Sequence, residues 1–214
     1  MTNHSDDRKF DGKIIDFDWC VKFFEKRGQE MYGPNFRIIP DDHEIIYKLV
    51  VYFLGHEQES KRLGLDLRKG IMLTGPIGCG KTSLMSLMRL VPAKERNFTM
   101  KTARDISFEF IQEGYDVINR YSKLSFTGTG PRIYCFDDLG AEQNLKYYGN
   151  SCNVMGEILL SRYDLYSNQH MISHLTTNLG AAEIEMIYGP RVRSRMREMF
   201  NLVSFSNDRI DRRI

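Results

Sequence analysis

The apolar positions in the first third of the chain recur at the spacing of amphipathic helices. In "DFDWCVKFFEKRGQEMYG" the residues Phe17, Val21 and Phe24 follow near-helical spacing before a break at Gly33 and Pro34. A second apolar stripe lies in "DDHEIIYKLVVYFLGHEQESKRLG" and consists of Ile45, Ile46, Leu49, Val50, Phe53 and Leu54. This segment opens with the capping candidates Asp41 and Asp42. The pattern therefore predicts two helices, after polar residues 1–12 that are expected to be frayed.

From Gly70 onward, short apolar runs alternate with helical patterns. The strand-like runs are "GIMLTG", "NFTMKT", "RIYCFDD", "HMISHLTTN" and "NLVSF". Helices are predicted between them over residues 81–91, 104–123, 152–167, 181–187 and 190–200, and two flexible loops over 125–131 and 141–151. Such alternation is typical of an α/β fold, here a five-stranded parallel sheet sandwiched by helices. A chain of 214 residues suits one main core.

The composition excludes several classes of protein. The 30 basic and 28 acidic residues nearly cancel, so any binding to polyanions must come from local clusters. The four cysteines are far apart and include no CxxC pair, which favours a reduced, cytoplasmic protein and excludes a zinc-bearing domain. No signal pattern and no run long enough for a membrane span is present. A cytoplasmic protein that does not bind membranes is expected.

The segment "GPIGCGKT" matches the phosphate-loop pattern G-x-x-x-x-G-K-[ST] between a strand that ends at Thr74 and a helix that starts near Lys81. In such a loop, successive backbone N–H groups surround a phosphate. Lys81 is expected to reach the β- and γ-phosphates of ATP, and the Thr82 hydroxyl to hold Mg²⁺. The expected ATP-binding residues are Gly75, Pro76, Ile77, Gly78, Cys79, Gly80, Lys81, Thr82 and Ser83. A chance glycine-rich turn is the weaker alternative.

Polar residues end two further predicted strands. Asp137 and Asp138 close "RIYCFDD", and ligands of open α/β sheets bind beyond such strand ends. Asp137 is expected to hold Mg²⁺ through water, and Asp138 to orient or deprotonate the attacking water. A pair that only caps the next loop is the alternative. Thr176, Thr177 and Asn178 end "HMISHLTTN" and could place an amide or hydroxyl beside the γ-phosphate, although "TNLG" also suits a plain turn.

A strand, "NFTMKT", lies between these two motifs in the sequence. This order suits the ATPase branch of P-loop proteins, in which another strand separates the phosphate-loop strand from the carboxylate strand in space.

Together the motifs resemble a known family. The order and spacing of "GPIGCGKT", "IYCFDDLGAE", "LLSRYDLYSNQHMISHLTTNLG" and "GPRVRSRM" resemble AAA+ ATPases of the helicase-loader type, the DnaC and IstB-like family, over residues 65–206. The resemblance implies an ATP- and Mg²⁺-dependent ATPase core that acts on single-stranded or double-stranded DNA. It also implies assembly into a ring or spiral, in which one subunit's arginine reaches the neighbour's nucleotide. The implied partner is a replicative helicase or a transposase, docked by the helical region 1–64.

Carried over to this sequence, the resemblance assigns Lys81 and Thr82 to Walker A, and Asp137 and Asp138 to Walker B. It assigns Asn178 to sensor I and Arg195 to the arginine finger. The implied catalytic residues are therefore Lys81, Asp138, Asn178 and Arg195. Arg162 in "LLSRY" matches a family arginine to which the sequence gives no role.

Two departures from the family pattern bear on function. Many AAA+ proteins have glutamate where Asp138 stands, although the IstB-like branch resembles this form, so the turnover rate is an open question. The sequence ends soon after the fifth strand, so we expect no C-terminal helical lid. Any sensor II arginine would then come from the basic tail 207–214, which contains Arg209, Arg212 and Arg213.

In "GPRVRSRMREMF" four arginines alternate with other residues behind Pro190, which suits the first position of a helix. A helix turns about 100° per residue, so Arg191 and Arg195 share one ridge, and Arg193 and Arg197 share another about 160° away. Between them an apolar stripe is expected to be buried, namely Val192, Met196, Met199 and Phe200. Four arginines on two ridges cannot grip one run of phosphates.

The resemblance implies that single-stranded DNA would pass along the inner face of the ring, near the segment "KTARDISFEFIQEGYDVINRYSK". Charge and one stacking ring are supplied by Lys101, Arg104, Arg120, Tyr121 and Lys123. The apolar residues Phe108, Ile111, Tyr115 and Ile118 have core spacing. For the basic residues, an ordinary solvated face is an equally good interpretation.

The leading hypothesis is an ATP-hydrolysing helicase loader or transposition helper that assembles through shared nucleotide sites. The alternative is a nucleotide-gated assembly module with little turnover, as the aspartate at 138 and the missing lid suggest. A small-molecule phosphotransferase ranks last, because no acceptor-binding segment is visible.

Overall fold

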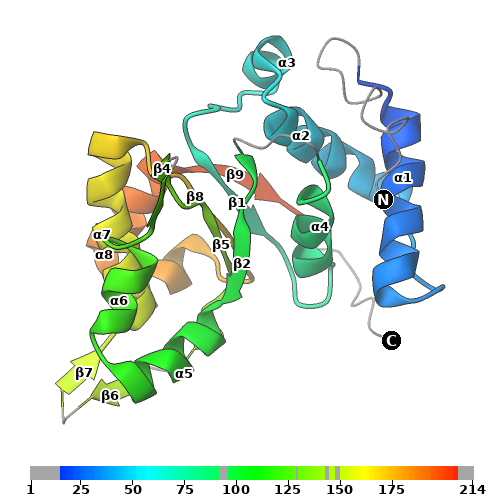
Figure 1. Cartoon of the computed structure of the whole chain (residues 1–214). Helices are drawn as coiled ribbons and strands as arrows, with labels where there is room; N and C mark the ends of the chain where they lie inside the picture. Colours follow the sequence, from blue (N-terminus) through cyan, green and yellow to red (C-terminus); the bar gives the residue numbers. More distant parts are fainter. Residues whose placement is uncertain (1–14, 92–95, 129, 143–144, 148–149, 207–214) are drawn as a thin grey trace. The chain divides into compact units, whose positions relative to one another are not determined.

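The computed structural model describes residues 15–91, 96–128, 130–142, 145–147 and 150–206 (Figure 1). Its contacts divide the chain into two compact units. One contains residues 1–67 and 80–97, and the other contains residues 68–79 and 98–214. Each unit has buried apolar side chains of its own.

The first unit is helical. It contains α1 (Phe17–Tyr32), α2 (His43–Leu54), α3 (Glu57–Arg62) and α4 (Lys81–Met88), and a 3₁₀ turn η2 (Pro40–Asp42) precedes α2. Helix α1 begins where the Asp16 carboxylate accepts the Trp19 N–H at 3.0 Å, and it ends at Gly33. The predicted first helix is confirmed. Both α1 and α2 contact α4, and they bury apolar residues such as Phe24, Leu49 and Met85.

The second predicted segment forms two helices. Helix α2 ends at Gly55, which adopts a left-handed conformation with φ 69°. The short helix α3 follows, and the His56 ring accepts the Glu59 N–H at its start. Asp42 occupies the N-cap position of α2, but its side chain makes no capping hydrogen bond. The predicted apolar stripe is buried at Ile45, Ile46, Leu49, Val50 and Phe53.

The second unit contains the predicted five-stranded sheet. Its strands are β1 (Gly70–Thr74), β2 (Thr99–Thr102), β5 (Tyr134–Leu139), β8 (Ser173–Thr177) and β9 (Phe200–Ser204). Their order is β2-β5-β8-β1-β9, and every neighbouring pair is parallel. The predicted α/β fold with a five-stranded parallel sheet and helices is therefore confirmed. Strand β8 separates β1 from β5, as predicted for the ATPase branch.

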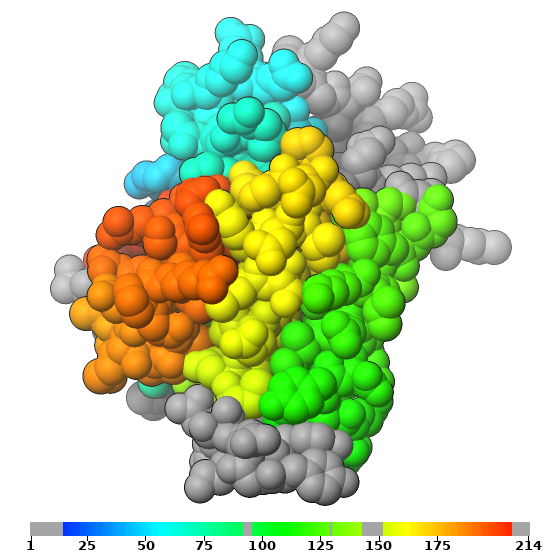
Figure 2. Space-filling model, turned by 90° about the vertical axis from the view of Figure 1, so that its left-hand side faces the viewer, coloured from blue at the N-terminus to red at the C-terminus, as the bar shows by residue number. Residues whose placement is uncertain are grey.

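The described residues of this unit form four helices, which are α5 (Ala103–Glu113), α6 (Asp116–Tyr121), α7 (Val154–Gln169) and α8 (Ala181–Met199). Figure 2 shows α7 in yellow between α8 in orange and the green α5 and α6, and α7 contacts all three. Helix α7 begins two residues after the predicted start, where the Asn153 side chain accepts the Gly156 N–H at 2.9 Å.

The predicted helix 104–123 is wrong, because Gly114 ends α5 with φ 67° and ψ −142°. The core assignment drawn from that helix is also wrong for three residues. Phe108, Ile111 and Tyr115 are each 50% exposed, and of the four predicted core residues only Ile118 is buried. Helix α5 instead buries Ala103, Ile106 and Phe110. The four residues predicted to be buried do not share one face, because they are distributed over two helices and the segment between them.

The arginine segment folds as predicted. Helix α8 is interrupted at Gly189, where φ is 87° and ψ is 163°, so two helical segments meet there and Pro190 follows the break. The stripe between the arginine ridges is buried, with Val192, Met196, Met199 and Phe200 all below a tenth exposed.

Both loops that were expected to be flexible contain short antiparallel strand pairs. One is β3 (Phe126–Thr127) with β4 (Gly130–Pro131), and the other is β6 (Leu145–Tyr147) with β7 (Asn150–Cys152). The expected frayed start and the tail arginines Arg209, Arg212 and Arg213 lie outside the described residues. Within the described ranges, every helix is too short or too polar to span a bilayer.

Candidate functional site

The predicted phosphate loop joins β1 to α4. Gly78 and Gly80 adopt positive φ angles of 78° and 97°, and Gly80 is the N-cap residue of α4. A residue with a side chain would be strained in this conformation. At Gly80 this explains why the pattern requires glycine, whereas Gly78 occupies one of its variable positions. Lys81, Thr82 and Ser83 open α4 in the first unit, where Lys81 is buried and Thr82 is exposed. The loop up to Cys79, whose side chain is also buried, belongs to the second unit.

The carboxyl ends of three neighbouring strands meet at one edge of the sheet. Thr177 in β8 is level with Thr74 in β1 on one side and with Leu139 in β5 on the other. Gly75 and Asn178 directly follow two of these strands, and the predicted carboxylates lie at the end of the third. The structure therefore brings the start of the phosphate loop, the carboxylates and Asn178 to a single edge of the second unit.

Asp137 is held in place by a threonine of the neighbouring strand. Its side chain is 5% exposed, and Oδ1 accepts a hydrogen bond from the Thr176 hydroxyl at 2.7 Å. The same hydroxyl oxygen accepts the backbone N–H of Asp138 at 2.8 Å. Thr176 thus uses its donor and an acceptor position within the sheet and fixes the orientation of the Asp137 carboxylate.

The second threonine is also engaged within the protein. The Thr177 hydroxyl donates to the carbonyl oxygen of Leu139 at 2.6 Å and accepts the Leu179 N–H at 3.1 Å. Of the three polar residues that end this strand, only Asn178 has an exposed side chain. If one of the three side chains meets a ligand, the geometry selects Asn178 rather than the two threonines.

Asp138 differs from Asp137 in backbone and in exposure. Its φ of 57° is left-handed, and the register of β5 against β8 shifts between Phe136 and Leu139. This conformation costs a non-glycine residue about 1–3 kcal/mol, although aspartate tolerates it better than most. Asp138 is exposed whereas Asp137 is buried, so the two adjacent carboxylates are suited to different tasks.

The turn after these carboxylates is tied to the start of the arginine segment. Glu142 accepts the Gly140 N–H through Oε2 at 2.8 Å and the Tyr188 hydroxyl through Oε1. Burial raises the pKa of the Tyr188 hydroxyl, and the Glu142 charge adds to this effect. Tyr188 immediately precedes the break at Gly189, so one side chain links the carboxylate loop to the helix that carries the arginines. This contact could not be predicted from the sequence, in which Glu142 and Tyr188 are 46 positions apart.

Arg162, which the sequence left without a role, is a structural residue. Its side chain is fully buried, and loss of hydration lowers the pKa of its guanidinium. It donates at 2.6 Å from Nε to the Ser173 hydroxyl, and through its two other nitrogens to backbone carbonyls. These acceptors belong to Tyr121, Arg132 and Ile172, at 2.8–3.0 Å. A guanidinium in this position joins α7 to α6 and to the start of β8.

The four arginines of α8 have different surroundings. Arg195 donates from Nη1 to the Tyr163 hydroxyl at 3.0 Å and to Glu198 at 3.2 Å. Arg193 forms an ion pair with Glu185 on the first segment of α8. Arg191 and Arg197 are exposed. Arg193 and Arg195, which were predicted to lie on different ridges of the helix, therefore have different partners.

Acidic residues contact several residues of the candidate DNA surface. Lys101, Arg120 and the Tyr121 hydroxyl all contact Glu109, and Arg120 also pairs with Glu113. Tyr121 is 2% exposed, so its ring cannot stack on a base in this conformation. This acidic cluster neutralises much of the charge that the sequence suggested for phosphate binding.

Two of the predicted DNA residues remain available. Lys123 is exposed, and the Arg104 guanidinium lies 5.4 Å from the ring centre of the exposed Phe108. An exposed ring beside an arginine is a suitable platform for base stacking.

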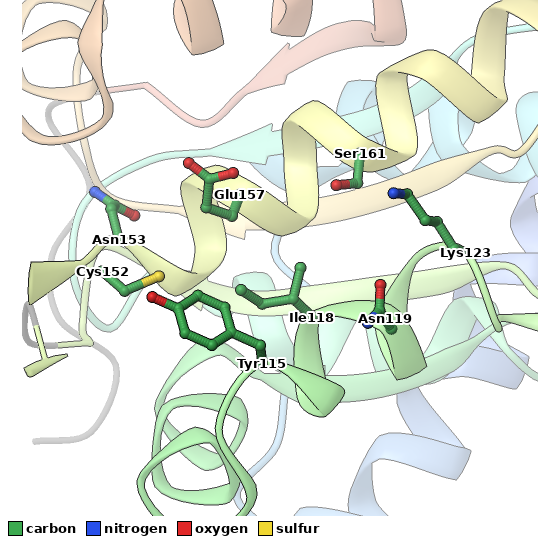
Figure 3. Close-up of a pocket in the computed structure, with 8 residues that line it drawn as sticks. All are labelled: Tyr115, Ile118, Asn119, Lys123, Cys152, Asn153, Glu157 and Ser161. Carbon is green, nitrogen blue, oxygen red and sulfur yellow. The ribbon is translucent and has the colours of Figure 1, made fainter. Parts of the chain in front are cut away.

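A groove of about 340 Å³ lies between α6 and α7 (Figure 3). Lys123 and Ser161 lie at one end, and Cys152 and Asn153 at the other. Glu157 is the acidic residue among its lining side chains, and its charge opposes that of Lys123. The groove therefore has no excess positive charge that would attract a phosphate group.

Comparison with protein-family models and with curated protein sequences finds no match. Solved structures do match. The crystal structure of the DnaC helicase loader is 18% identical, with a TM-score of 0.56, and the match covers 86% of this chain and 99% of that chain. A structure from Streptococcus pyogenes serotype M3, assigned to a primosome component, is 15% identical with a TM-score of 0.52, covering 79% and 81%. The fold is therefore similar to the folds of these two structures, and the resemblance seen in the motifs is confirmed at the level of the fold.

Proposed function

We propose that this protein is a Mg²⁺-dependent ATPase of the helicase-loader type that acts on DNA. The observation that carries the proposal is the shared strand-end edge, where the phosphate loop begins beside a buried and an exposed carboxylate. In AAA+ proteins these parts bind ATP, hold the metal ion and activate water. The loader fold supports the same assignment.

The residues fit ATP and magnesium chemically. Gly78 and Gly80 provide the backbone conformation that a phosphate-binding loop needs, and α4 starts at the end of that loop. The Thr82 hydroxyl and the Asp137 carboxylate are oxygen ligands of the kind that Mg²⁺ prefers. Bound Mg²⁺ would neutralise charge that develops on the phosphates. In this proposal residues 75–83 bind ATP, and Lys81 contacts its β- and γ-phosphates.

Asp138 and Asn178 are the proposed groups that act on the attacking water and the γ-phosphate. Both side chains are exposed at the strand-end edge, unlike Thr176 and Thr177. A carboxylate at this place can orient the water or accept its proton, and an amide can hydrogen-bond the γ-phosphate. Arg195 is proposed to act on the nucleotide of a neighbouring subunit, which requires assembly into a ring or spiral.

The proposed partners are DNA and either a replicative helicase or a transposase, which the helical region 1–64 would dock. A second candidate function, a nucleotide-gated assembly module with little turnover, is favoured by one observation. Asp138 has a shorter side chain than the glutamate common in AAA+ proteins, and its backbone is strained at a φ of 57°. The choice between these functions depends on the rate of hydrolysis, because both require ATP binding.

Calorimetric titration of ATP with and without Mg²⁺, followed by phosphate-release assays with single-stranded DNA, tests the proposal. We expect the unmodified protein to bind and hydrolyse ATP, Lys81→Ala to lose binding, and Asp138→Asn to bind ATP but lose hydrolysis. ATP binding with hydrolysis no faster than that of Asp138→Asn would select the assembly module. Absence of ATP binding in the unmodified protein would overturn both functions.

A further inference from the structure

Arg195 belongs to a closed cluster of three side chains. Its guanidinium carbon lies 4.3 Å from the centre of the Tyr163 ring, and Nη1 donates to the Tyr163 hydroxyl at 3.0 Å. The Tyr163 hydroxyl donates in turn to Glu198 Oε2 at 2.8 Å, while Oε1 of Glu198 accepts Arg195 Nη1 at 3.2 Å. Each member therefore contacts the other two, and the cluster joins α7 to the last turns of α8.

The cluster restricts a side chain that would otherwise move freely. An arginine on the surface carries about 2 kcal/mol of rotamer entropy, which it must lose before it can contact a ligand in one geometry. The ring and the two acceptors fix Arg195 before any ligand arrives. The Tyr163 hydroxyl and the Arg195 charge hold the pKa of the Glu198 carboxyl below its usual value, so this acceptor stays anionic at neutral pH.

The contacts occupy one side of the guanidinium. All hydrogen bonds that Arg195 makes within the described residues use Nη1, which leaves Nε and Nη2 without a protein acceptor there. These two nitrogens form one edge of the planar group, and that edge matches two oxygens of a phosphate. The side chain is 37% exposed, so the edge is accessible. Arg193, by contrast, is engaged by Glu185.

We propose that Tyr163 is a positioning residue, which holds Arg195 so that its Nε–Nη2 edge meets the terminal phosphate of a nucleotide bound by a second copy of this chain. The inference rests on the proposed function, in which Arg195 acts on a neighbour's ATP. Tyr163 does not touch the nucleotide in this account. Its ring supports the guanidinium, and its hydroxyl orients Nη1 and Glu198 together. Glu198 is the second positioning residue, because it is the acidic partner of the cluster.

Mixed assemblies test this role by separating the two sides of the interface. A donor chain carries Lys81→Ala, so its own nucleotide site is inactive but its Arg195 is intact. An acceptor chain carries Arg195→Ala, so its nucleotide site is intact but depends on a donor arginine. ATP hydrolysis in the mixture then arises where a donor arginine faces an acceptor nucleotide.

Tyr163→Leu is placed in the donor or in the acceptor, and kcat and KM for ATP are measured in each mixture. We expect the donor variant to lower kcat about tenfold or more, because small displacements of a catalytic group are costly, with KM changed less than twofold. The same substitution in the acceptor should leave both constants unchanged. Tyr163→Phe in the donor keeps the ring and should recover part of the rate. Tyr166→Phe, on the same helix, is the matched control, because the Tyr166 hydroxyl donates to the backbone carbonyl of Glu198 at 3.3 Å.

Equal losses from donor and acceptor variants would show a merely structural role and overturn the proposal. An active mixture whose kcat does not change when the donor carries Tyr163→Leu would also overturn the proposal, but it would not contradict the proposed function. The mixture of donor and acceptor without a Tyr163 substitution could also be inactive although its subunits assemble. That result would reject the hypothesis that Arg195 acts on a neighbour's nucleotide, and with it the positioning role of Tyr163.

Discussion

Thr176 and Asp137 form a hydrogen-bonded pair at the carboxyl ends of two adjacent strands. The hydroxyl donates to Asp137 Oδ1 at 2.7 Å and accepts the Asp138 N–H at 2.8 Å. The pair is almost fully buried, so water cannot readily replace the hydroxyl. One side chain therefore supports both the proposed metal-binding carboxylate and the backbone of the residue that carries the second carboxylate.

Thr176→Val removes this hydroxyl while nearly preserving the shape of the side chain. We expect the Mg²⁺ concentration needed for half-maximal ATP hydrolysis to rise about 10–100-fold, the usual effect of losing a group that orients a metal ligand. Thr176→Ser retains the hydroxyl and serves as the control. Unchanged Mg²⁺ dependence in the valine variant would show that Asp137 needs no such support.

Arg162→Met should destabilise the second unit. The substitution leaves the Ser173 hydroxyl and three backbone carbonyls without their donor, and each buried unsatisfied group costs about 1–3 kcal/mol. We expect urea denaturation followed by circular dichroism to give a free energy of unfolding lower by about 3 kcal/mol or more. Arg120→Met, at an exposed ion pair, is the comparison and should cost about 1 kcal/mol or less. Similar losses in the two variants would contradict the structural role of Arg162.

Arg104→Ala should weaken binding of single-stranded DNA more than Arg120→Ala does. Arg104 lies over the exposed Phe108 ring, whereas Arg120 is neutralised by Glu109 and Glu113. Fluorescence anisotropy across a range of salt concentrations should show the salt slope reduced by about one for Arg104→Ala. A larger change in slope for Arg120→Ala would mean that DNA displaces the acidic cluster, and it would restore the surface suggested by the sequence.

Arg195→Ala should retain nucleotide binding and lose about 10³-fold in turnover, because an arginine supplied by a neighbour stabilises charge in the transition state. Arg193→Ala removes an ion pair within α8 and should change turnover little. Steady-state hydrolysis together with ATP titration measures both effects. Equal losses that follow salt concentration would favour a nucleic-acid role for the whole helix.

The parts of this fold that could be predicted are those that depend on residues close together in the sequence. The strand before Gly75, the break at Gly189 and Pro190, and the buried stripe behind it all follow from short-range rules on φ angles and periodicity. Gly114 is an instructive failure. A single glycine is tolerated within many helices, so the apolar spacing from Phe108 to Ile118 suggested one helix where the chain forms two.

The contacts that organise the candidate site could not be predicted in this way. Thr176 supports Asp137 across 39 positions, and Tyr163 supports Arg195 across 32. Each depends on which strands and helices become neighbours, and periodicity along one chain carries no such information. The residue types at the site were predictable because chemistry restricts them, whereas their supporting side chains are set by the tertiary fold.

The most direct test of the central claim, an ATPase whose nucleotide site is shared between subunits, is the specific ATPase activity measured over a wide range of protein concentration. Saturating Mg²⁺ and ATP are held constant, with and without single-stranded DNA. The account predicts a specific activity that rises with protein concentration, because each site needs an arginine from a second chain. A specific activity that is constant across the range down to dilutions at which light scattering finds only monomers would contradict it.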